Sequence, residues 1–226
     1  MKQKYSPGRP KSLTLVKIAG YSCHAENVTR SQKMNRYSGR HFVKMSDSYL
    51  SIVPVDVTPS EVKQLFQKTF DWLTEKEIIS PNPTDCILSG TPGYKPGSRY
   101  KDIVDGDDFG LLQRQVNGLE IVTERQVFDC GENGLDEVNC PECRANNLDS
   151  EWAEAIEAWW RSTGYHKLKC NQCGKESPII DYEFIPTWAF GDFGLKFWNW
   201  PVLKDSFFDD LKIVMDKDVK VVYGRL

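Results

Sequence analysis

The sequence lacks the signatures of several large enzyme classes. It has three histidines, and it contains no G-x-S-x-G motif, no glycine-rich phosphate-binding loop and no H-x-E motif beside its cysteines. These motifs are typical of hydrolases, nucleotide-binding proteins and zinc deaminases. We therefore expect none of these activities, and the sequence leans towards a protein that is not an enzyme.

Long apolar runs are missing as well. No segment approaches the roughly 18 uninterrupted apolar residues that indicate a transmembrane helix, so we expect no membrane partner. Seven cysteines in 226 residues are also too sparse for a small secreted disulfide scaffold. Reduced thiols and a cytoplasmic location fit this pattern better.

Acidic residues are nearly absent from residues 1–44. This segment has ten Lys and Arg against the single acid Glu26, a net charge of +9, whereas the remainder has 19 basic and 31 acidic residues, a net charge of −12. We expect residues 1–44 to be a basic, disordered extension and the folded body to begin near Met45. So acidic a body repels the phosphates of nucleic acids and favours a basic partner.

The body begins with a strand pattern followed by a strong helix start. Residues 49–55 alternate like a strand, and Thr58, Pro59 and Glu61 have the spacing of an N-cap, a first helical residue and a capping box. We expect a helix over 59–76. We expect its buried face to consist of Val62, Leu65, Phe66, Phe70 or Thr69, and Leu73.

The remaining pattern predicts an α+β fold with a mostly antiparallel sheet and two packed helices, for which a ferredoxin-like arrangement is the nearest candidate. Residues 80–117 are rich in Pro and Gly, so we expect a long irregular connection there. Further strands are expected at 119–128, 179–187, 193–200 and 219–223, and further helices at 151–162 and from 205.

Four cysteines form two pairs of identical spacing, Cys140-Pro-Glu-Cys143 and Cys170-Asn-Gln-Cys173. Two C-x2-C turns supply four thiolates, a donor set that suits tetrahedral Zn²⁺ better than metals that prefer oxygen. A closed shell of four sulfurs leaves no position for water, so the predicted Zn²⁺ is structural. Buried or redox-active thiols and an iron–sulfur cluster are the alternatives.

The two pairs, read as Cys-Pro-Glu-Cys and Cys-Asn-Gln-Cys-Gly, resemble the knuckles of a zinc ribbon over residues 138–176. We therefore expect this segment to be inserted into an α+β body formed by residues 45–137 and 177–226. The body also resembles small bacterial proteins through Tyr49-Leu-Ser-Ile-Val-Pro-Val, Phe128-Asp-Cys-Gly and Phe197-Trp-Asn-Trp-Pro. Some proteins of that sort look like immunity factors for bacterial toxins, and the resemblance implies no known reaction.

Two hypotheses for function follow. The first is a zinc-binding protein that acts by binding another protein, such as a basic toxin, through a surface patch of Trp188, Trp198 and Trp200, because Trp is enriched at binding hot spots. The second is nucleic-acid binding by the zinc ribbon. Its candidate contacts are the four basic residues around the cysteines, Arg144, Lys167, Lys169 and Lys175.

Overall fold

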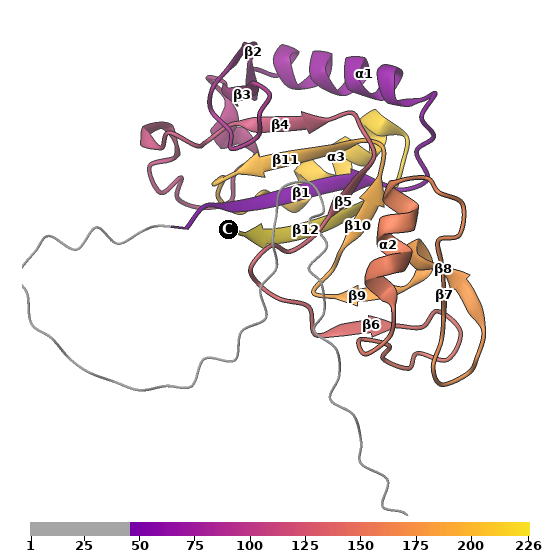
Figure 1. Cartoon of the computed structure of the whole chain (residues 1–226). Helices are drawn as coiled ribbons and strands as arrows, with labels where there is room; N and C mark the ends of the chain where they lie inside the picture. The colour runs from indigo at the N-terminus through magenta and orange to yellow at the C-terminus, as the bar shows by residue number, and fades with distance from the viewer. Residues whose placement is uncertain (1–45) are drawn as a thin grey trace, which may run out of the picture. The chain divides into compact units, whose positions relative to one another are not determined.

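The centre of the fold is a six-stranded antiparallel sheet with the strand order β12-β1-β11-β4-β3-β2 (Figure 1). The computed structural model describes residues 46–226, so the extension expected at residues 1–44 lies outside the described part. The predicted α+β class with a mostly antiparallel sheet is confirmed. The strands are β1 (Ser48–Pro54), β2 (Ile79–Thr84), β3 (Gly93–Pro96), β4 (Leu119–Val122), β11 (Gly194–Trp198) and β12 (Val219–Arg225).

Two helices, α1 (Val62–Glu75) and α3 (Asp205–Met215), pack against one face of this sheet. Leu73 of α1 and Leu211 of α3 are both completely buried and share one core with Phe197 of β11. The apolar face expected for the first helix is confirmed, since Leu65, Thr69 and Leu73 are its buried residues. Within residues 46–226, no helix is long and apolar enough to cross a bilayer.

Helix α1 begins three residues later than its capping signal predicts. Residues 59–61 form a turn in which the Glu61 N–H donates to the Thr58 carbonyl at 3.0 Å. The Glu61 carboxylate still accepts the Thr58 N–H at 2.8 Å, so half of the capping box is present. The Glu61 N–H is taken by the turn, and the helix therefore starts at Val62.

The chain order β1-α1-β4 followed by β11-α3-β12 has the β-α-β-β-α-β pattern of ferredoxin-like folds. Strands β2 and β3 extend the sheet beyond β4. Both fall in the segment 80–117 or at its start, which we expected to be irregular, so that expectation is wrong for these residues. Short 3-10 helices at Tyr100–Ile103 and Leu111–Gln113 account for part of the rest.

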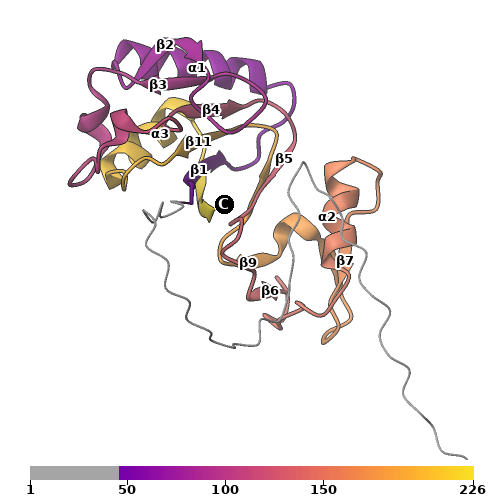
Figure 2. The ribbon, with the colours of Figure 1, turned by 60° about the vertical axis from the view of Figure 1, so that its left-hand side comes forward.

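The chain leaves the sheet after β4 and returns just before β11, and a second group of elements lies between (Figure 2). The strand expected at 119–128 is split, because β4 pairs in the large sheet while β5 pairs with β10. The expected strand 179–187 shortens to β9 after a 3-10 turn at Ile179–Asp181. The elements are β5 (Gln126–Phe128), β6 (Glu137–Asn139), α2 (Trp152–Trp160), β7 (Lys167–Lys169), β8 (Glu176–Pro178), β9 (Glu183–Ile185) and β10 (Ala189–Gly191).

Candidate metal centre

The fold brings together the sulfur atoms of four cysteines that lie up to 33 residues apart. Cys140 Sγ is 3.9 Å from Cys173 Sγ, Cys143 Sγ is 3.6 Å from Cys170 Sγ, and all four sulfurs lie within 4.8 Å of one another. None of them is in a disulfide. A tetrahedral zinc with Zn–S bonds of about 2.3 Å places its sulfurs about 3.8 Å apart. The S–S separations of 3.9 and 3.6 Å fit that geometry, so the four cysteines fit a tetrahedral metal ion.

The two cysteine turns have the same backbone hydrogen bonds. In each, the carbonyl of the first cysteine accepts the N–H four positions later, from Arg144 or from Gly174, at 3.0 Å in both turns. The N–H of the first cysteine donates to the carbonyl five positions later. Cys140 donates to Ala145 at 3.0 Å, and Cys170 donates to Lys175 at 2.9 Å. Arg144 and Gly174 have φ of 64° and 74°, so Arg144 adopts the left-handed conformation that glycine favours.

Main-chain N–H groups point at the sulfurs. Those of Gln172 and Cys173 donate to Cys170 Sγ at 3.4 and 3.5 Å, and the Glu142 N–H donates to Cys140 Sγ at 3.4 Å. The N–H groups of Cys173 and Gln172 stabilise the thiolate and lower the pKa of Cys170 to about 6, although burial opposes them. The second turn thus favours the thiolate form of Cys170, whereas burial and the neighbouring cysteines raise the pKa of Cys143 to about 11.

The first cysteine of each pair is buried, and the second is exposed. The buried Asn147 lies between the two turns, and its side chain bonds to both of them. Sequence reasoning missed this residue. The run Asn146-Asn147-Leu-Asp reads as an ordinary polar turn, and no spacing marks a buried asparagine.

The basic residues considered for nucleic-acid contact are largely matched by acids. Arg144 forms an ion pair with Glu183, and Lys175 forms one with Glu142 across the two turns. Lys167 and Lys169 are exposed on β7 and line an open groove of about 570 Å³. The acids of the same groove are Asp149, Glu151 and Glu154.

The three tryptophans considered as a partner patch do not form one surface. Trp198 is 1% exposed and donates from Nε1 to Glu120 at 2.9 Å, and Trp200 is 8% exposed and donates to the Asn117 carbonyl at 2.8 Å. Trp188 is half-buried and stacks on Phe184. Trp198 and Trp200 therefore belong to the core, and of these three tryptophans only Trp188 is partly exposed.

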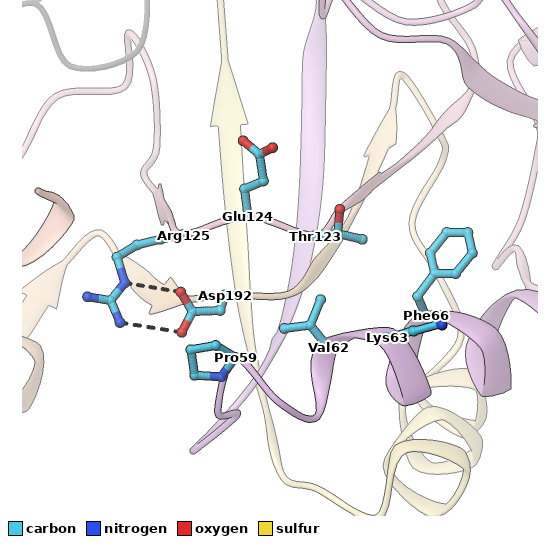
Figure 3. A pocket seen from close by; sticks show the side chains of 8 residues that line it. All are labelled: Pro59, Val62, Lys63, Phe66, Thr123, Glu124, Arg125 and Asp192. Carbon is cyan, nitrogen blue, oxygen red and sulfur yellow. Dashed lines mark hydrogen bonds and ion pairs between the residues drawn. The ribbon is translucent and has the colours of Figure 1, made fainter. Parts of the chain in front are cut away.

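A hollow of about 660 Å³ lies between the start of α1 and the segment that leaves β4 (Figure 3). Arg125 at one end donates to Asp192 at 3.0 Å, to the Trp159 carbonyl at 3.2 Å and to Ser162 Oγ at 2.7 Å. Its guanidinium is thus occupied by structural contacts and joins α2 to the chain beside β4. The lining residues are Pro59, Val62, Lys63, Phe66, Thr123, Glu124, Arg125 and Asp192.

Comparison of the chain with protein-family models, with curated proteins and with solved structures finds no match. The resemblance to bacterial toxin-immunity proteins therefore stays a prediction without support from a family. The four-cysteine cluster, in contrast, stands on its own geometry as a possible metal site.

Proposed function

We propose that this chain is a non-enzymatic zinc-binding protein of the cytoplasm that acts by binding another protein. The convergence of four thiols within 4.8 Å carries the zinc part of the proposal. Cys140, Cys143, Cys170 and Cys173 would hold the ion in a closed sulfur shell. The ion, when bound, supplies four metal–sulfur bonds that cross-link the two turns.

In this proposal residues 138–176 are a zinc ribbon whose metal is structural. Each cysteine pair follows a short strand, β6 or β7, and each turn folds back onto itself. Besides sulfur, the ion pair Lys175–Glu142 and the hydrogen bond from the Asn171 N–H to Asn147 link the two turns. Bound zinc contributes on the order of 10 kcal/mol to folding in small modules of this kind.

Elemental analysis of freshly purified protein tests the metal. We expect one zinc per chain, and loss of zinc on replacing both exposed ligands, Cys143→Ser and Cys173→Ser. Protein that is folded and free of zinc, or that holds iron in its place, contradicts this part of the proposal.

The surface proposed to bind a protein is the outer edge of β12. Arg225 donates its N–H to the Cys130 carbonyl at 3.3 Å and accepts from the Glu132 N–H at 2.7 Å, so its main-chain groups point away from β1. These directions alternate along an antiparallel strand. The main-chain groups of Val219 and Val221 therefore also point outward, and residues 46–226 offer them no hydrogen-bond partner.

The two edges of the sheet differ in a way that favours this choice. Strand β2, at the other edge, has Pro81 and Pro83 and a register shift between Ile79 and Pro83, features that discourage pairing. Strand β12 has no proline, and its open groups are those of Val219 and Val221, because the Tyr223 carbonyl accepts from the Asn133 side chain at 3.4 Å; the ring of Tyr223 is exposed. An extended segment of a partner can add to such an edge through main-chain hydrogen bonds.

The acidic balance of residues 45–226, net −12, favours a basic partner such as a nuclease toxin. Affinity capture compares the wild-type chain with Val221→Pro, which removes the central outward N–H, and with Val202→Ala, which trims an exposed apolar residue elsewhere. We expect Val221→Pro alone to lose the partner while its circular dichroism stays that of the wild type. Equal capture by all three proteins contradicts binding at this edge.

Nucleic-acid binding by the cysteine turns is the alternative. The ion pairs Arg144–Glu183 and Lys175–Glu142 weigh against it, since each removes one of the free cations that phosphates would need. Titration with single- and double-stranded DNA and RNA at several salt concentrations separates the two readings. Salt-sensitive binding that is lost in Lys167→Glu would favour the alternative.

A further inference from the structure

Asn147 is a buried polar residue that forms hydrogen bonds through both its main chain and its side chain. It is 1% exposed, its N–H donates to the Val138 carbonyl at 2.8 Å, and its carbonyl accepts the Ser150 N–H at 2.9 Å. Its side chain donates from Nδ2 to the Ala145 carbonyl at 2.7 Å and accepts at Oδ1 from the Asn171 N–H at 2.8 Å.

The two side-chain partners lie on different cysteine turns. Ala145 directly follows the first turn, and its carbonyl also accepts the Cys140 N–H. Asn171 is the residue after Cys170 and lies inside the second turn. One amide group therefore bridges the two halves of the sulfur cluster, and it does so with short, direct bonds at a site closed to water.

Such a bridge fixes the distance between the turns without the help of the metal. Two other polar links cross the cluster. The ion pair Lys175–Glu142 joins exposed side chains and contributes little because water screens it. The buried Tyr182 hydroxyl bonds to the Leu168 carbonyl at 2.9 Å and to Cys140. A buried amide that loses one partner leaves a main-chain group without a hydrogen bond. The relative position of Cys140 and Cys170 thus depends on Asn147 more than on this surface pair.

We propose that Asn147 is a positioning residue for the metal, which holds the two cysteine turns at the separation that a tetrahedral ion requires. This inference rests on the proposed metal site. Replacing a residue that orients metal ligands through hydrogen bonds commonly weakens metal affinity by about 10- to 100-fold. Asn147 acts in this way through the main chain of the turns and through a side-chain hydrogen bond to Cys170.

The full-length chain is titrated with Zn²⁺ against a competing chelator, and separately with Co²⁺, whose absorption bands report the geometry of its sulfur ligands. Asn147→Leu keeps the size of the side chain and removes all of its hydrogen bonds. Asn146→Ala is the matched control, because Asn146 Oδ1 accepts from Val138 and Leu148 at 3.0 and 2.9 Å, both on the same half of the module.

We expect Asn147→Leu to raise the Kd for Zn²⁺ by about 10- to 100-fold and to alter the Co²⁺ bands, while Asn146→Ala keeps the wild-type bands. If Asn147→Leu does not fold even in excess Zn²⁺, Asn147→Asp, which keeps the acceptor for Asn171, gives the same comparison. A wild-type Kd and spectrum in the Asn147 variants, or an equal loss in Asn146→Ala, overturns the inference. A wild-type chain that binds no metal instead overturns the proposed function itself.

Discussion

Replacing Gly224 by alanine is expected to destabilise the sheet through a single collision. A Cβ at this position of β12 would lie closer than 3.0 Å to two carbons of the Tyr49 ring and to its hydroxyl oxygen, a separation that real side chains avoid. The ring has little freedom to retreat. It is 6% exposed, its hydroxyl bonds to Asp129 Oδ1 at 3.1 Å, and it lies 5.2 Å from the Trp198 ring and 4.4 Å from Lys196 Nζ.

The expected cost combines two opposing effects. Overpacking a well-filled site costs about 1–3 kcal/mol, and this site falls near the upper end because the ring is held on several sides. Replacing glycine also reduces the entropy of the unfolded chain, which recovers about 0.4–1 kcal/mol. The net loss in the free energy of unfolding is about 2 kcal/mol, which lowers the Tm of a chain of this size by about 4–8 °C.

Urea and thermal denaturation of Gly224→Ala, followed by circular dichroism, measure this loss. Gly90→Ala is the matched control, because a Cβ at Gly90 meets nothing within 4 Å, and we expect no loss there. In a Tyr49→Leu background the ring is absent, so the added methyl costs less and the double-mutant cycle gives a coupling of about 1–2 kcal/mol. A Gly224→Ala protein as stable as the wild type, or a coupling of zero, would refute the reasoning.

Three further predictions concern other parts of the chain. Chelation of the metal removes on the order of 10 kcal/mol from the folding of residues 138–176, so hydrogen exchange rises there while the amides of β1 stay protected. Arg125→Lys lacks the planar fork that reaches Asp192 and Ser162 together, and it lowers the free energy of unfolding in urea by about 1–3 kcal/mol. The Tyr100 hydroxyl, Lys101 and a backbone N–H lower the pKa of Asp108 from 3.8 to about 2, so its stabilisation is present above pH 3.8 and is lost as the pH falls through about 2. Asp108→Asn therefore flattens the fall of Tm with pH in that window.

The sequence was sufficient to predict four of the six strands of the main sheet and its two helices, because one local signal dominates in each of them. The face of α1 follows from helical periodicity, and the cysteine cluster follows from two spacings that have few other uses. The split between β4 and β5 could not be predicted from the sequence. It depends on pairing with β11 and β10, strands roughly 70 residues further along the chain.

The prolines of β2 account for the wrong expectation of an irregular segment there. Pro81 and Pro83 argue against a strand in the middle of a sheet, but β2 lies at an edge, where a missing N–H costs little. The tryptophans show a related problem. Period-two alternation assigns Phe197 and Trp198 to opposite faces, but it does not say that both faces of β11 are covered. Trp198 is buried because Cys86 and Ile87 pack over it.

The strand order also constrains when the sheet can assemble. The first described strand, β1, lies between β11 and β12, so Ser48 pairs opposite Arg225, 177 positions later in the chain. Strand β1 has no neighbour until β11 has been synthesised, and it lacks its second neighbour until β12 has been synthesised. Contacts that span so much chain form slowly. The cysteine cluster and its packing partners are complete earlier, because β6 pairs with β9 and α2 packs on Trp188 and Phe190, all of which precede residue 194. The supply of the proposed zinc would then affect how compact residues 123–193 are before β1 can pair.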